Sequence, residues 1–71
     1  TNPTCELRRF RMSRGMTQAE VASKAGISRV YVSRIESNRT CPTIGISLKL
    51  AQILGVSVED LFVWPQVGSQ Q

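Results

Sequence analysis

The sequence predicts an all-α fold, a compact bundle of five short helices, and three observations lead to this prediction. Apolar residues recur at intervals of three and four, the spacing of one face of a helix. Hydrophobic residues make up 41% of the 71-residue chain and aromatic residues only 6%, so aliphatic side chains must form the core. Each helical segment follows a residue whose hydroxyl can cap it, namely Thr4, Thr17, Ser28, Thr43 and Ser57.

The first helix should run from Thr4 to about Gly15 and carry an arginine on its buried side. Leu7 and Phe10 fall on one stripe, and Arg11 lies on or beside that stripe rather than on the opposite face. A guanidinium so close to the core needs a partner, because burying an unpaired charge is costly.

The next two helices are short and closely connected. Residues 17–20 form a capping box, in which the threonine hydroxyl and the glutamate carboxylate each accept from the other's backbone N–H. Helix two should end at Gly26, which tolerates the positive φ of a turn. Ser28 should cap a third helix over residues 29–37, and Asn38 tolerates the left-handed conformation that stops it.

Helix three should be amphipathic, with Tyr31, Val32 and Ile35 together on one side. The other side presents residues with few uses in a core, namely Arg29, Val30, Ser33, Arg34 and Ser37. Two short helices joined by a tight turn make a helix-turn-helix when the second presents such a face outward. The major groove of B-DNA, about 12 Å wide, admits one helix, and arginine matches the O6 and N7 acceptors of guanine.

The fourth helix should follow Thr43 and end at Gly55. Gly45 in its first turn costs about 1 kcal/mol relative to alanine. We expect its inward face to contain Ile44, Leu48, Ala51 and Leu54, with Leu50 alongside.

A fifth short helix should follow Ser57 and end before Pro65. The apolar run at its end exceeds one helical stripe and leaves two uses open, closure of the core or a subunit interface. That run is Leu61, Phe62, Val63 and Trp64. A chain of this length forms one small domain, which we assign to residues 1–64, with residues 65–71 as a tail or the start of a linker.

The net charge of +4 and a pI near 9.8 indicate a polyanionic partner. The arginines gather in two groups, Arg8, Arg9, Arg11 and Arg14 in the first helix and Arg29, Arg34 and Arg39 further along. Nucleic acid is favoured over a membrane surface, because no apolar run approaches the roughly 20 residues of a transmembrane helix. With no visible signal peptide, we expect a cytoplasmic protein of a bacterium or phage. Arg8 and Arg9 are expected to lie on a solvated face rather than contact DNA.

Cys5 and Cys41 are the only cysteines and the chain has no histidine, which predicts that there is no metal site and no cofactor. Two free thiols in a reducing cytoplasm are favoured over a disulfide, which stays open. An enzyme would need a nucleophile with a base, paired carboxylates or a metal. Glu59 and Asp60 are better explained as the acidic start of a helix, so we predict that the protein is not an enzyme.

Residues 17–36, TQAEVASKAGISRVYVSRIE, resemble the helix-turn-helix of the Cro and phage-repressor family, also called the xenobiotic response element family. The resemblance extends over about 55 residues and includes the later segment LKLAQILGVSVEDLF. It implies a lambda-repressor-like fold and a transcriptional regulator, most often a repressor, that binds double-stranded DNA. It also implies a homodimer, formed through the C-terminal helix region, on a palindromic or pseudo-palindromic operator.

The resemblance assigns roles to individual residues. Gln18 and Arg39 would contact phosphates, and Arg11 would pair with Glu36. The residues that would face bases or the nearby backbone are Ser28, Arg29, Val30, Ser33 and Arg34. The alternative is a protein-interaction module with the same fold, such as an antitoxin or adaptor, whose binding would depend weakly on salt. The arginines on the outward face of helix three argue against that alternative.

Overall fold

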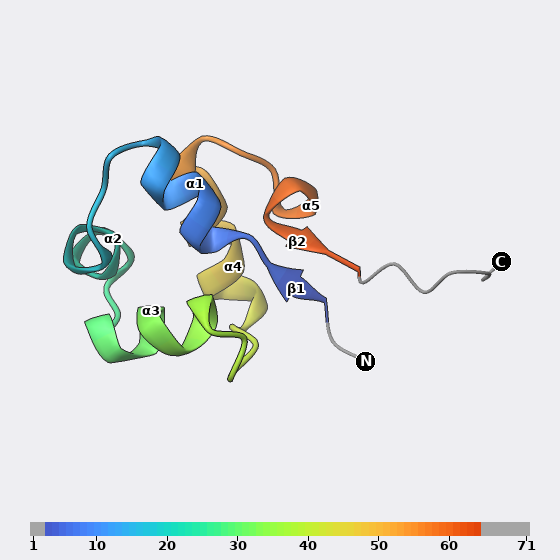
Figure 1. Cartoon of the computed structure of the whole chain (residues 1–71), viewed down its shortest axis with the longest axis horizontal. Helices are drawn as coiled ribbons and strands as arrows, with labels where there is room; N and C mark the ends of the chain where they lie inside the picture. The colour runs from blue at the N-terminus through green and yellow to red at the C-terminus, as the bar shows by residue number, and fades with distance from the viewer. Residues whose placement is uncertain (1–2, 65–71) are drawn as a thin grey trace, which may run out of the picture.

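The computed structural model describes residues 3–64 and has five helices and two short strands in that range (Figure 1). In chain order they are β1 (Thr4–Cys5), α1 (Leu7–Ser13), α2 (Gln18–Ala25), α3 (Arg29–Glu36), α4 (Ile44–Leu54), α5 (Val58–Leu61) and β2 (Phe62–Val63). The predicted bundle of five short helices is confirmed, with one strand pair added. The predicted tail, residues 65–71, lies outside the described residues. Within residues 3–64, no helix has the length and apolar character needed to cross a membrane.

The two strands form an antiparallel pair that joins the two ends of the domain. Thr4 lies opposite Val63, and next to this pair the backbone N–H of Glu6 donates to the carbonyl of Leu61 at 2.7 Å. The prediction that Thr4 caps helix one is therefore wrong, because that residue is held in an extended strand. The helix begins instead at Leu7, and the side chain of its N-cap residue, Glu6, makes no capping hydrogen bond.

Helix five ends earlier than predicted, at Leu61 rather than just before Pro65. The next residue, Phe62, has extended backbone angles and continues into β2. Leu61 and Phe62 pack in or against the core, whereas Val63 and Trp64 are 43% and 67% exposed. The first half of the apolar run therefore helps to close the core, and its second half lies on the surface.

The other predicted caps are confirmed. A hydroxyl oxygen accepts from the backbone N–H three residues further on, at 3.0 to 3.3 Å, in Thr17, Ser28, Thr43 and Ser57. Gly26 ends α2 with φ of 71°, and Asn38 follows α3 with φ of 60°. The Asn38 side-chain oxygen also accepts from the backbone N–H of Cys5 at 3.1 Å, which ties the end of α3 to β1.

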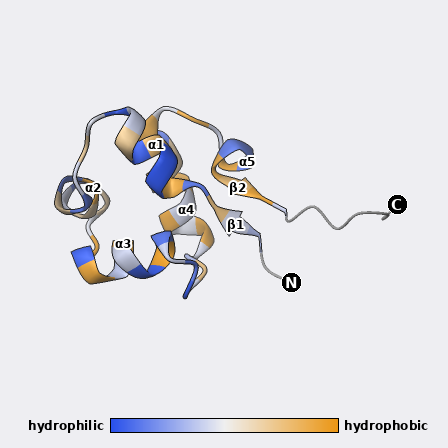
Figure 2. Ribbon diagram, in the orientation of Figure 1, coloured by the Kyte–Doolittle hydropathy of each residue, from blue (hydrophilic) through white to orange (hydrophobic). Residues whose placement is uncertain are grey.

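The core is built from aliphatic side chains of all five helices. The largest that are fully buried are Leu7, Val21, Val32, Ile35, Leu50, Leu54 and Leu61. The inward face predicted for α4 is partly wrong, because Ile44 and Leu48 are 77% and 57% exposed while Ser47 is buried. The Ser47 hydroxyl donates to the carbonyl of Thr43 at 2.8 Å, so its polar group is satisfied inside. Hydrophobic colour runs along most of α4 (Figure 2), so apolar spacing alone could not select the buried side.

Cys5 and Cys41 are both free thiols in different environments. Burial raises the pKa of the Cys5 thiol from 9.0 to about 11, whereas Cys41 is exposed. The unfolded chain would release the Cys5 proton near pH 9, but the folded chain keeps it until about pH 11. The stability that comes from burying this neutral thiol is therefore complete below pH 9 and is lost as the pH rises toward 11.

Alkylation with iodoacetamide at pH 8 should modify Cys41 first and Cys5 only when the domain unfolds. A thiol of pKa about 11 is deprotonated at pH 8 in only about one molecule in a thousand, and Cys5 is 8% exposed. Mass spectrometry over time should show one rapid addition, with a second that becomes rapid in urea. Equal rates for the two thiols in the native protein would contradict this account, and Cys41→Ser should abolish the rapid addition.

Candidate nucleic-acid interface

The connection between α2 and α3 is short and tightly folded. Gly26 takes the left-handed conformation, and the next residue, Ile27, donates its backbone N–H to the carbonyl of Ala22 at 3.0 Å. Ala22 and Ala25 are buried on α2, and such small side chains allow another helix to approach closely. Ser28 then caps α3 directly. This arrangement of two short helices and a tight turn is a helix-turn-helix.

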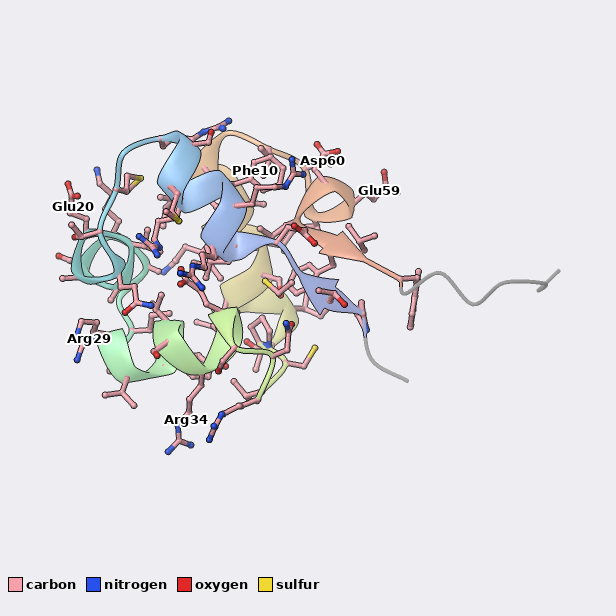
Figure 3. All side chains as sticks on the ribbon, in the orientation of Figure 1. Phe10, Glu20, Arg29, Arg34, Glu59 and Asp60 are labelled. Carbon is pink, nitrogen blue, oxygen red and sulfur yellow. The ribbon has the colours of Figure 1, made fainter. Side chains whose placement is uncertain are left out.

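The two sides of α3 differ as its sequence predicts. Val32 and Ile35 are fully buried. Arg29, Val30 and Arg34 are exposed, and Figure 3 shows both arginines pointing away from the body of the domain. The side chains of α3 that face solvent are thus cationic and polar, with Val30 as a 56% exposed apolar exception.

A nearly buried ion pair fixes α3 against α1. The Nε of Arg11 donates to one carboxylate oxygen of Glu36 at 2.6 Å and its Nη2 to the other at 3.2 Å. The Nη1 of Arg11 donates to the carbonyl of Met16 at 2.8 Å. The two charged side chains are only 13% and 5% exposed. The partner that the sequence requires for Arg11 is therefore present.

Gln18 extends this pair to the surface of α3. Its side-chain nitrogen donates to Glu36 at 3.0 Å, and its side-chain oxygen accepts from Arg29 at 3.3 Å. A primary amide has two N–H groups, so Gln18 keeps one for another acceptor. Sequence reasoning selected Gln18 and Arg29 only as separate contacts. It missed that a continuous chain of hydrogen bonds joins them to the ion pair of Arg11 and Glu36, because residues 11 to 25 positions apart carry no local signal.

The remaining predicted site residues gather on the same side. An open hollow of about 490 Å³, here called the Arg39 hollow, is lined by Val30, Ser33, Arg34, Ser37 and Arg39. The backbone N–H of Arg39 donates to the carbonyl of Arg34 at 2.9 Å, which holds the loop after α3 close to the helix. Ser28 is exposed but already engaged as a cap, since its hydroxyl oxygen accepts from the backbone of Tyr31.

The exposed arginines of α3 lie far from the acidic residues of α5. Figure 3 shows Glu59 and Asp60 at α5, at the opposite end of the domain from Arg29 and Arg34. Glu36, at the end of α3, is neutralised by Arg11, and Figure 3 shows Glu20 on the neighbouring α2. The outward side of α3 is therefore positive, which suits a polyanion.

Comparison with known proteins agrees with this geometry. A family model described as helix-turn-helix matches residues 7–61, from the first residue of α1 to the last of α5. The chain belongs to the Cro/C1-type helix-turn-helix family, whose members include transcriptional regulators.

Individual relatives are similar over most of the described chain. An HTH-type transcriptional regulator of Archaeoglobus fulgidus is 34% identical over 58 residues, which are 82% of this chain and 83% of that protein. The transcriptional regulator SinR of Bacillus subtilis is 38% identical over 56 residues, 78% of this chain but only 50% of SinR. A crystal structure of SinR in complex with DNA superposes with a TM-score of 0.68 at 38% identity, and covers 73% of this chain and 84% of that one.

Removing the carboxylate in Glu36→Ala should lower the free energy of unfolding by about 3 to 5 kcal/mol, because it leaves the Arg11 guanidinium buried without its partner. Glu6→Ala is the matched control, since Glu6 pairs with Arg9 on the surface at 3.3 Å with side chains 30% and 67% exposed. In Glu6→Ala the free energy of unfolding should fall by no more than about 1 kcal/mol. Urea unfolding followed by circular dichroism measures both, and equal losses would show that burial does not strengthen the inner pair.

Proposed function

We propose that this protein is a transcriptional regulator that places α3 in the major groove of a specific double-stranded DNA site and represses by occupying it. The observation that carries the proposal is the helix itself, buried on the Val32 and Ile35 side and cationic on the Arg29 and Arg34 side. Family membership and the likeness to SinR, solved in complex with DNA, support it.

Each residue of the interface has a role that its chemistry suits. Arg34 and Arg29 can donate to guanine, and Val30 can pack against a thymine methyl group. Gln18 has one free amide N–H, and Arg39 stands at the edge of its hollow, so both suit phosphates, which position a protein on DNA without specifying sequence. Arg29 is steadied by Gln18 before DNA arrives, which lowers the entropy that its ordering would cost.

Selection of bound duplexes from a random library should recover an inverted repeat. Arg34→Ala should weaken binding to the selected duplex by about 1 to 3 kcal/mol and relax the preference at one base pair of each half-site. Arg9→Ala, which removes the same charge from α1, is the control and should keep the preference. If no sequence is enriched, this function is wrong and the protein-interaction module becomes the better explanation.

The inverted repeat would reflect a homodimer, for which the domain offers an apolar surface away from α3. Ile44 and Trp64 are exposed there, and Leu48 and Val63 are further exposed apolar residues of α4 and β2. Beside them an apolar hollow of about 320 Å³ lies between the start of α4 and the α5–β2 segment, and Ile44, Phe62 and Trp64 line it. A second copy of the chain is the occupant that we propose. Two-fold dimers of this kind read half-sites about 34 Å apart.

Ile44→Glu should shift the chain toward monomer and weaken binding to the full repeat more than to a single half-site. Met12→Glu is the matched control, because Met12 is a 60% exposed apolar residue on α1, outside this surface. Sedimentation equilibrium measures the association. A dimer that forms equally well in Ile44→Glu would place the interface elsewhere.

A further inference from the structure

The exposed side of α3 lies between two hollows, and arginine side chains line both of them. One is the Arg39 hollow. The other, here called the Arg8 hollow, has a volume of about 250 Å³ and is lined by Arg8, Arg11, Gln18, Ser33, Glu36 and Ser37. Ser33 and Ser37 line both hollows, so they mark the ridge that separates them. The Arg8 hollow lies where α1, the start of α2 and α3 meet.

The charges of the Arg8 hollow do not cancel. Arg11 directs its donors to Glu36 and to the Met16 carbonyl, so this pair contributes no net charge. Arg8 is exposed, and within residues 3–64 its guanidinium has no hydrogen bond or ion pair. Gln18 also keeps one amide N–H. The hollow therefore has one uncommitted positive charge and a further donor beside it.

The neighbouring arginines of α1, Arg9 and Arg14, already have contacts within the domain. The guanidinium of Arg9 bonds to Glu6 at 3.3 Å and stacks on Phe10 at 4.6 Å from the ring centre. Arg14 lies 5.6 Å from the same ring and donates to the hydroxyl of Ser13. Figure 3 places Phe10 beside Asp60, far from the labelled arginines of α3. Both Arg8 and Arg9 are exposed, as expected for solvated side chains, but of the two only Arg8 lines the hollow beside α3.

We propose that the Arg8 hollow binds a phosphate of the DNA backbone, with Arg8 as its cation. A helix in the major groove has a sugar-phosphate strand on each side of it. Hollows on both sides of the α3 ridge match that geometry, so the Arg8 hollow takes the strand opposite the one at the Arg39 hollow. This inference rests on the proposed function and adds to it a second phosphate clamp that fixes how α3 sits in the groove.

The first test is a salt series with the selected duplex, comparing wild type with Arg8→Ala, Arg8→Lys and the matched control Arg9→Ala. Arg8→Ala removes one phosphate contact from each subunit of the dimer, so the slope of log K against log salt on the full repeat should fall by about 1.8. Its affinity defect should then shrink about 12-fold between 50 and 200 mM salt. Arg8→Lys should keep the wild-type slope, and the Arg8→Ala defect should be equal on matched and mismatched duplexes.

The second test locates the phosphate. Single phosphates of the duplex are replaced in turn by neutral methylphosphonate, and one position in each half-site should weaken wild type but leave Arg8→Ala unaffected. The inference is overturned if Arg8→Ala has the same salt slope as wild type, or if every methylphosphonate weakens Arg8→Ala as much as wild type. This holds even when Arg34→Ala loses affinity for the selected duplex and so supports the proposed function. If wild type selects no duplex, the proposed function fails and this inference fails with it. Both arginines are exposed, so thermal unfolding should confirm that all variants keep the fold.

Discussion

The arrangement of the first three helices depends on one carboxylate, that of Glu36. It accepts two hydrogen bonds from Arg11 on α1 and one from Gln18 on α2, and it lies at the last residue of α3. Apolar contacts hold the helices together without direction, whereas these hydrogen bonds have defined geometry. The Glu36 side chain is only 5% exposed, so removing Arg11 would leave a buried charge without a partner and would strongly destabilise the fold. The position of α3, and with it the direction of Arg29, follows from this constraint.

The fold keeps two kinds of surface apart. The Arg39 hollow and the apolar hollow beside Trp64 have no lining residue in common. Arg34 and Arg39 line the first hollow, whereas Ile44, Phe62 and Trp64 line the second. A protein with this division can bind DNA on one side and a second copy on another at the same time. The pairing of β1 with β2 holds the segment that leads to Trp64 in place, and so helps to position the apolar hollow.

Signals between residues close in sequence predicted most of the fold. The features that sequence analysis did not predict depend on contacts between residues far apart in the chain. Capping residues such as Thr17 and Ser28 act within three residues, so their effect can be read from sequence. The pairing of Thr4 with Val63 joins strands of two residues each, too short for a periodic pattern. The apolar residues of α4 occupy more than one face, so Ile44 was assigned inside although it is exposed. Arg8 and Arg9 are identical neighbours, and only the packing of α1 distinguishes their surroundings.

Chemical-shift mapping would show whether the polar chain from Arg11 to Arg29 holds a surface that binds DNA. Backbone amide signals of the labelled protein are followed as the selected duplex is added. The largest changes should fall at residues 17–18 and 28–39, with smaller changes near Arg8 and almost none at Glu59 and Asp60. Changes concentrated on α4 and β2, with α3 unaffected, would contradict this prediction.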